Sequence, residues 1–464
     1  MISRCFTMES QLRFAGLSGD HNPLHIDPVA ARRSLLGGAA VHGVHLLLWA
    51  LDALAAESAV GGFARLRVQF ERCVAVGKSV DLAWLDEGGR LVGRLTDETG
   101  ILARISLTRA DWPLSQWSGA TELGRLACEE HELADMPGKA GHLEIILPSD
   151  WAAMFPNLAR SFQADTTALL LSTTRLVGMV VPGLHSMYFG LDLRAEPGVP
   201  TGNTLHYAVT RVDTRIRLVE VAVHAGGVRG TISAFARPKP FAQRPMGELR
   251  GIVGAEEFSG QEAMVIGGSR GLGELTAKLL ALGGASVTIT WQQGEADAQA
   301  IVAEAVALGL FMRAQQFNAL EPPFLEPDQP KRYTHLYYFA TPRIPAGQLG
   351  RFDPAIFSNL LNIYVVGFVR TTNWIVPRAV PNACIWFPST IFVEQPDPHF
   401  PEYSAAKACG EALCAQFRLQ MAPLRFVADR LPRLPTDQTQ GLIDLRVSDG
   451  VSNLLAILRR HATL

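Results

Sequence analysis

The stretch AMVIGGSRGLG at residues 263–273 joins a short apolar run to a glycine-rich turn, and a helix-like pattern then continues to about Leu282. A second strand-like run at 286–290 and a second helix-like run at 296–308 follow. Strands that alternate with helices in this way indicate parallel α/β architecture. The sequence therefore predicts an α/β domain over residues 259–464.

The glycine-rich turn has the chemistry of a dinucleotide-binding loop. Glycines let the backbone approach a pyrophosphate, and the N-terminus of the following helix favours anions. Taken alone, the glycine spacing fits an ordinary turn equally well. The residues predicted to contact a cofactor at this turn are Gly267, Ser269, Arg270, Gly271, Leu272 and Gly273.

A second motif, TyrSerAlaAlaLys, places Tyr403 and Lys407 four residues apart on one face of a helix. An ammonium group beside a phenol stabilises the phenolate and lowers the pKa of the tyrosine, which makes it a usable proton donor near neutral pH. Ser389, fourteen residues before Tyr403, could hold a substrate oxygen by hydrogen bonding. Each residue alone is equally compatible with a loop hydroxyl or an amphipathic helix pair.

Together the two motifs make residues 260–464 resemble the short-chain dehydrogenase/reductase family. The resemblance implies a Rossmann-type, doubly wound parallel sheet. It also implies Ser389, Tyr403 and Lys407 as a catalytic triad, with Tyr403 and Lys407 in contact with the cofactor. Asn362 would be a fourth member of the proton relay, although AsnIleTyrValValGly has a longer Asn-to-Gly interval than the family.

Two further stretches bear on the cofactor. The AsnAsnAlaGly of the family reads TyrTyrPheAlaThrPro at 337–342, which loses the Asn but keeps Ala340, where the backbone can approach the cofactor. The second strand ends in ThrTrpGlnGln at 290–293, without the acid that commonly binds the ribose hydroxyls of NAD. Arg270 could instead pair with a 2′-phosphate. The sequence therefore favours NADPH.

The N-terminal region contains SerGlyAspHisAsnProLeuHis at 18–25 and ValHisGly at 41–43. A loop that holds Asp20 and His25 together would let a carboxylate and an imidazole share one water as a base and acid pair. The N–H groups of a helix that begins at 42–43 could polarise a thioester carbonyl. Asp, Asn and Pro are also ordinary turn residues, so these letters alone favour a turn and a helix cap.

In this order and spacing, the same residues resemble the MaoC-like, (R)-specific enoyl-CoA hydratase family of hot-dog proteins, over about residues 10–110. The resemblance implies Asp20 and His25 as the dyad that adds or removes water across C2–C3. Asn22 would hold the loop, and the Gly43 N–H would polarise the thioester. The acyl group would ride on coenzyme A or an acyl-carrier protein.

An internal repeat extends this region. An apolar helix at 41–54 precedes several strand-like runs, and a helical segment at 156–180 precedes another set. The second copy lacks the loop motif, and Asp165 and His185 are its best polar candidates. We expect an α+β double hot dog whose second half is catalytically silent, completes the sheet and encloses the acyl tunnel. The predicted domains are 1–115, 116–238, a linker at 239–258, and 259–464.

Bulk composition restricts the remaining possibilities. The chain has 464 residues, of which 48% are apolar and 19% charged, with a formal net charge of −2. This balance gives no electrostatic footprint for nucleic acid or an anionic membrane. Apolar runs are interrupted before they reach membrane-spanning length. The six scattered cysteines suggest neither a disulfide framework nor a metal site, and we expect a cytoplasmic protein. The resemblances imply a homo-oligomer.

The two predicted sites perform consecutive steps. Reduction of a 3-oxoacyl thioester gives a 3-hydroxyacyl thioester, and dehydration of that gives a 2-enoyl product. One alternative is the oxidative direction, in which an (R)-specific hydratase feeds a 3-hydroxyacyl dehydrogenase. Another is a non-catalytic acyl- or NADPH-binding protein, which the lost AsnAsnAlaGly favours and the two intact catalytic sets oppose.

Overall fold

A computed structural model describes residues 2–462 of the chain, except 35, 59, 111–116, 197–198, 200, 324–331 and 442–445. The described chain forms two compact units, of which the first extends to Lys239 and the second begins at Pro240. The predicted domain boundary between residues 115 and 116 lies outside the described residues.

The first unit is built on a ten-stranded antiparallel sheet with the strand order β1-β3-β4-β5-β2-β7-β10-β9-β8-β6. At its centre β2 pairs with β7, with Leu66 opposite Leu193, so two five-strand halves form one sheet. The strands are β1 (Ile2–Cys5), β2 (Gly62–Phe70), β3 (Ser79–Glu87), β4 (Arg90–Asp97), β5 (Gly100–Ala110), β6 (Ala140–Glu144), β7 (Ser186–Ala195), β8 (Thr204–Asp213), β9 (Leu218–Ala225) and β10 (Val228–Ala236).

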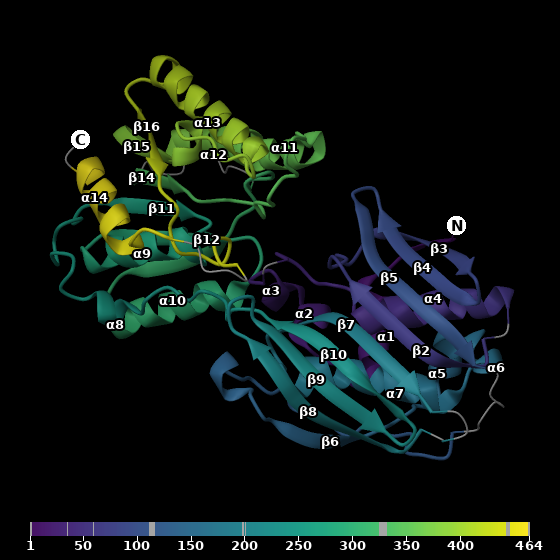
Figure 1. The fold of residues 1–464 in the computed structure, drawn as a ribbon. Helices are drawn as coiled ribbons and strands as arrows, with labels where there is room; N and C mark the ends of the chain where they lie inside the picture. Colours follow the sequence, from purple (N-terminus) through teal and green to yellow (C-terminus); the bar gives the residue numbers. More distant parts are fainter. Residues whose placement is uncertain are drawn as a thin grey trace. The chain divides into compact units, whose positions relative to one another are not determined.

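Each half packs a long buried helix against the same face of this sheet (Figure 1). These are α4 (Gly43–Glu57) and α7 (Ala164–Arg175), and in α7 every residue except Asp165 is buried. Successive strand residues point to opposite faces, so Leu66 lies in the shared core while its neighbour Arg67 is exposed. An apolar helix surface is therefore buried against one face, and the other face is polar.

Shorter helices connect these elements. The predicted helical segment at 156–180 is divided, because the extended backbone at Phe162 bridges Gly61 and the Gln163 N–H donates to the Gly61 carbonyl. The shorter elements of this unit are α1 (Met8–Ser18), α2 (Pro23–Ile26), α3 (Pro28–Ala31), η1 (Leu133–Asp135), α5 (Trp151–Met154), α6 (Leu158–Ser161) and the π-helical η2 (Leu176–Val180).

The second unit is built on a six-stranded parallel sheet with the order β13-β12-β11-β14-β15-β16. Its strands are β11 (Glu262–Ile266), β12 (Ser286–Trp291), β13 (Met312–Gln316), β14 (Tyr333–Tyr338), β15 (Ala379–Thr390) and β16 (Arg425–Leu431). Its helices are α8 (Met246–Leu249), α9 (Gly271–Leu282), α10 (Glu295–Ala307), α11 (Pro354–Leu361), η3 (Asn362–Gly367), α12 (Phe368–Ile375), η4 (Val376–Arg378), η5 (Ile391–Val393), α13 (Pro401–Gln420) and α14 (Gly450–Ala462).

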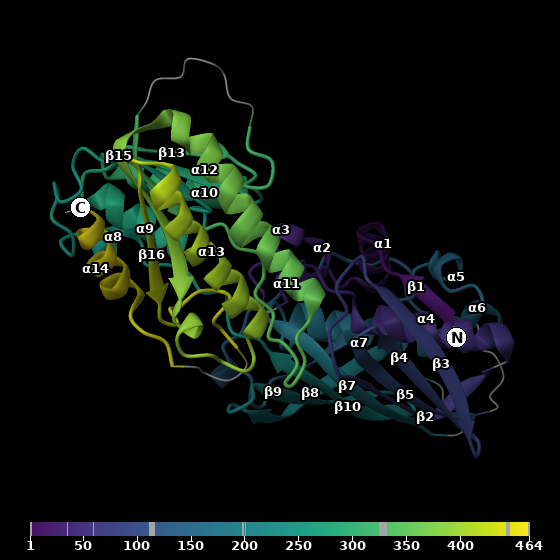
Figure 2. The same ribbon diagram turned by 90° about the horizontal axis from the view of Figure 1, so that it is seen from above.

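Helices cover both faces of the parallel sheet. Val265 of β11 belongs to the apolar cluster that contains α9 and α14, whereas its neighbours Met264 and Ile266 belong to the cluster with α12 and α13. Figures 1 and 2 show this grouping, with α9, α10 and α14 on one side and α11–α13 on the other. Strands buried on both faces are apolar without alternation, as the sequence of β11 is.

The connection between the units is partly packed. Met246 and Leu249 of α8, together with Phe258, are buried in the cluster around α9. Residues 240–258, which were predicted as part of a linker, therefore belong to the second unit, because their apolar side chains pack into its core.

Candidate active sites

Asp20 lies buried at the centre of the first candidate site. Its Oδ1 accepts a hydrogen bond from the Asn22 N–H at 3.2 Å, and its Oδ2 accepts one from the Thr174 hydroxyl of α7 at 2.6 Å. A Cβ at position 178 would overlap the Asp20 carboxylate, so a residue larger than glycine there would displace it. The carboxylate is thus held from both halves of the sheet.

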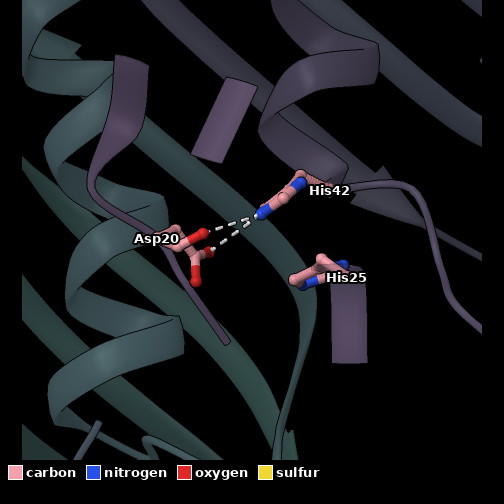
Figure 3. A group of neighbouring side chains, drawn as sticks. All are labelled: Asp20, His25 and His42. Carbon is pink, nitrogen blue, oxygen red and sulfur yellow. Dashed lines mark hydrogen bonds and ion pairs between the residues drawn. The ribbon is translucent and has the colours of Figure 1, made fainter. Parts of the chain in front are cut away.

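Two imidazoles face this carboxylate, and Figure 3 shows the three side chains converging. The Nδ1 of His25 lies 2.8 Å from the Ala40 carbonyl, which can only accept, so Nδ1 carries the proton and Nε2 keeps its lone pair. The His25 ring stacks on His42 with centroids 3.9 Å apart. The Nε2 of His42 lies 3.1 Å from the Asp20 backbone oxygen and 3.9 Å from Oδ2.

Burial controls the protonation of these groups. It raises the pKa of Asp20, against the opposing effects of His25 and Thr174. It lowers the pKa of His25 and places that of His42 well below its ordinary value. The imidazole of His25 is therefore held neutral, which suits a group that accepts a proton. The three residues bring possible ligand atoms within 4.8 Å of one another, a spacing that a metal ion could also use.

Asn22 fixes the loop that carries the dyad. Its side-chain N–H₂ group donates to the carbonyls of Gly178, Gly183 and Leu184, at 2.9, 3.1 and 3.2 Å. Its Oδ1 accepts from the Leu24 N–H and caps α2. These contacts tie the loop of the first half to the segment after α7 in the second half.

Gly43 begins α4, where the first backbone N–H groups have no acceptor within the helix. A Cβ at this position would press against the Phe70 ring at 3.0 Å, so the residue has to be small. His42 precedes it, and its backbone N–H donates to Gln11. The predicted donor to a thioester oxygen is therefore located at the helix start beside His42.

The second candidate site lies at the carboxyl ends of three strands of the parallel sheet, β11, β14 and β15. The glycine-rich turn follows β11, Ala340 follows β14, and Thr390 ends β15. Because neighbouring parallel strands run in the same direction, these ends share one edge of the sheet. A Cβ at Gly267 would meet the Phe339 backbone, and one at Gly273 would collide with the Gly267 carbonyl. The predicted turn is thus closely packed backbone.

Arg270 is the N-cap residue of α9, and its guanidinium lies 3.6 Å from the Asp437 carboxylate. An anion that paired with Arg270 would share or replace this contact. After β12 the chain reads Gln292 and Gln293, so no acid follows that strand before α10.

Tyr403 and Lys407 lie one turn apart on α13, as predicted. The predicted lowering of the Tyr403 pKa by Lys407 is wrong for this structure: burial raises the pKa of Tyr403 to about 12, against a hydrogen bond with the Thr390 hydroxyl that lowers it. Burial lowers the pKa of Lys407 to about 7. The Lys407 Nζ donates to the Pro388 carbonyl at 2.6 Å and lies 5.9 Å from the centre of the Tyr403 ring.

The structure places the other two predicted members differently. Ser389 donates a hydrogen bond to the Glu411 carboxylate at 2.6 Å, while its neighbour Thr390 contacts Tyr403. Asn362 begins η3, and it is Tyr364 whose ring lies 3.9 Å from the Lys407 Nζ. The Tyr364 hydroxyl is 2.5 Å from that of Thr341.

Comparison with known proteins identifies the first region. The family model described as "MaoC like domain" matches residues 2–102, which include Asp20, Asn22, His25 and Gly43. Residues 2–102 are therefore similar to a MaoC like domain. No curated protein matches the chain in sequence.

Just under half of the chain is similar to solved structures of short-chain dehydrogenases and related reductases. One from Burkholderia cenocepacia J2315, in complex with NADP, is 21% identical, with a TM-score of 0.38, over 44% of this chain and 91% of that one. A dehydrogenase/reductase from Sinorhizobium meliloti 1021 is 19% identical, at 0.39, over 45% and 90%. An NADPH-bound short chain oxidoreductase from Pseudomonas aeruginosa PAO1 with an atypical catalytic center is 18% identical, at 0.37, over 44% and 91%.

Sequence reasoning missed three partners of the MaoC like site. His42 was visible in the ValHisGly motif but was considered only as part of a helix entry. Thr174 and Gly178 lie in the second half, which was expected to be silent, and no local pattern marks them. Of the polar candidates proposed for that half, His185 pairs with Glu130 at 3.0 Å and Asp165 accepts from the Thr166 N–H. No helix in the described part of the chain is long and apolar enough to span a membrane.

Proposed function

We propose that the protein reduces 3-oxoacyl thioesters with NADPH and dehydrates the resulting 3-hydroxyacyl thioesters to 2-enoyl products. The observation that carries the proposal is the buried cluster of Asp20, His25 and His42 in a MaoC like domain, within the same chain as a glycine-rich turn and a Tyr403–Lys407 pair. The acyl group would be linked to coenzyme A or an acyl-carrier protein.

The sheet topologies support this assignment. In the first unit, two halves that each combine one long helix with five strands fit a double hot dog. In the second, the order β13-β12-β11-β14-β15-β16 corresponds to 3-2-1-4-5-6 of the doubly wound dinucleotide-binding sheet. We propose that residues 259–464 form the reductase domain.

The dehydration step uses the two buried acid–base groups. In our proposal one of the pair accepts a proton from C2 while the other protonates the departing C3 hydroxyl, and the released water lies between them. His25 suits the first role because its Nδ1 binds the Ala40 carbonyl, which leaves the lone pair of Nε2 available to accept a proton. Asp20, with its raised pKa, suits the second. The N–H groups at the start of α4 would stabilise the charge that develops on the thioester oxygen.

The residues of the second unit fit a nicotinamide dinucleotide. The glycines at 267, 271 and 273 add no side chain between the backbone and a pyrophosphate, and α9 starts within this turn, at Gly271. The absence of an acid after β12, among residues the structure describes, and the presence of Arg270 favour a 2′-phosphate. The cofactor would supply the hydride.

The protein groups would supply the proton for the carbonyl. Tyr403 donates it, and the Lys407 charge nearby stabilises the phenolate that remains. We propose that Thr390, which contacts Tyr403, holds the substrate oxygen in place of Ser389. Tyr364 would take the position predicted for Asn362 beside Lys407.

Purified protein would be incubated with a 3-oxoacyl thioester and NADPH, with absorbance and product mass followed together. We expect NADPH consumption and an enoyl product in the wild type. Asp20→Asn should stop at the 3-hydroxyacyl thioester, and Tyr403→Phe should abolish NADPH consumption. Supplying the 3-hydroxyacyl thioester directly should restore enoyl formation by Tyr403→Phe.

The rival readings give different results. An enzyme that works in the oxidative direction would hydrate enoyl thioesters and prefer NAD⁺ as oxidant. A protein that binds NADPH but consumes none, on either coenzyme A or carrier-bound substrates, would be a binding protein, and the proposal would be wrong.

A further inference from the structure

A row of basic side chains crosses the outer face of the ten-stranded sheet, on the side away from α4 and α7. Strand register aligns His206 with His224, His224 with Arg229, Arg229 with Arg194, and Arg194 with Arg65. We call these five residues the basic row. All except the half-buried Arg65 are exposed, and the rings of His206 and His224 stack at 4.7 Å.

The basic row borders a hollow of about 660 Å³. Its floor is formed at the next outward-facing positions of β8, β9 and β10, where Ala208, Ala222 and Thr231 lie opposite one another. The small side chains leave space, and the larger imidazoles and guanidiniums stand beside it. The hollow is open to solvent, because His206, His224 and Arg229 beside it are exposed, and it is large enough to admit a small ligand.

The charges in the row are not balanced. Arg65 pairs with Asp192 at 2.6 Å, and Arg229 pairs with Glu196 at 2.8 Å. Arg194 lies between these two guanidiniums in the register, so three arginines face two carboxylates. Like charges directly opposite on neighbouring strands destabilise a sheet. The row therefore has a cost in stability that a bound anion would offset.

We propose that the hollow beside the basic row binds the phosphate groups of a small, multiply charged anion. Guanidinium groups present parallel N–H donors that match phosphate oxygens, and the Thr231 hydroxyl adds a donor on the floor. A second copy of the chain is a poor occupant, because a two-fold contact would set the basic row against itself. The proposal does not depend on the reactions proposed above.

Titration calorimetry with inorganic pyrophosphate tests the site. The titration is run with saturating NADPH, so that the proposed dinucleotide loop is occupied. Under this condition we expect saturable binding to the wild type, with one site per chain, and a loss of affinity of about tenfold or more in the double variant Arg194→Gln/Arg229→Gln. Arg13→Gln, which removes an exposed charge from α1, is the matched control and should bind within about twofold of wild type. Equal weakening in both proteins would mean general charge attraction, and no saturable binding would also overturn the site.

Thermal unfolding gives a second, independent readout. If repulsion in the row is real, Arg194→Gln should melt at a higher temperature than the wild type without any anion. Pyrophosphate should raise the Tm of the wild type but not that of the double variant. A double variant that pyrophosphate still stabilises as much as the wild type would overturn the assignment to these residues, even if both proteins fold normally.

Discussion

The two halves of the antiparallel sheet have the same arrangement of one helix and five strands, but they contribute different residues to the candidate site. Each has a long buried helix and five strands, but among the described residues the cluster of one carboxylate and two imidazoles belongs to the first half. The second contributes the Thr174 hydroxyl and the space at Gly178, both directed at Asp20. The comparison teaches that a half that carries none of the predicted dyad can still contact and position a member of it.

The largest expected effect comes from filling the space at Gly178. In Gly178→Ala the new methyl group would displace the Asp20 carboxylate, and a displacement near 1 Å can reduce a rate by about 10²-fold. We expect dehydration of a 3-hydroxyacyl thioester to fall by about that factor or more. NADPH consumption by the same preparation should be unchanged and serves as the control for folding. Normal dehydration would show that the second half does not position Asp20.

Removal of the Thr174 hydroxyl sharpens the comparison. Thr174→Val deletes a hydrogen bond to a carboxylate, and we expect dehydration to slow by about tenfold. Because this bond lowers the pKa of Asp20, its loss should move the corresponding limb of the rate profile to higher pH. Thr174→Ser should restore both the rate and the profile. An unshifted profile in the valine variant would leave Thr174 with a packing role only.

The rate at the proposed reductase site should depend on pH through Lys407, whereas the first site has no lysine in its cluster. Burial holds the pKa of Lys407 near 7, so its charge is present below that pH and is lost above it. We expect the rate of carbonyl reduction to fall severalfold between about pH 6 and pH 8.5. Measurement of kcat against pH for both reactions would test this. A flat reductase profile would mean that Lys407 keeps its charge when substrates are bound.

The smallest expected effect is at His185, the polar residue of the second half that sequence analysis singled out. Its mostly covered ring pairs with the exposed Glu130 rather than with the Asp20 cluster. His185→Gln should change either rate by less than about twofold and the free energy of unfolding by about 0.5 kcal/mol or less. A large loss of dehydration would assign the second half a direct part in the chemistry.

Much of the fold could be predicted because its signals are local. The glycine-rich turn, the alternation of strands and helices after it, and the repeated helix-plus-strands pattern all lie within short windows of sequence. Asp20, Asn22 and His25 could be grouped for the same reason, since one loop carries them. Thr174 could not, because a threonine in a buried helix has no distinguishing pattern and lies 154 positions from Asp20.

Two predicted members of the second site, Ser389 and Asn362, have neighbours that lie closer to the Tyr403–Lys407 pair, and the reason is geometric. Successive residues of a strand point to opposite faces, so Ser389 and Thr390 at the end of β15 present their hydroxyls in different directions. Residues two apart on a helix also do not share a face, which separates Asn362 from Tyr364. A motif aligned one or two positions off would therefore select a side chain that points elsewhere. The catalytic roles of all these residues remain predictions.

The pairing of β2 with β7 has a consequence for how this protein can change. In a two-fold dimer of identical subunits every substitution occurs twice, so each copy must keep a complete site and also support its neighbour. Here the two halves of one sheet are encoded separately and joined in a single chain. A substitution on one side of the pairing has no obligatory twin on the other. Such broken symmetry lets one half specialise without loss of the other. In this chain Thr174 and Gly178 contact Asp20, and the equivalent positions of the first half need not do the same for the second.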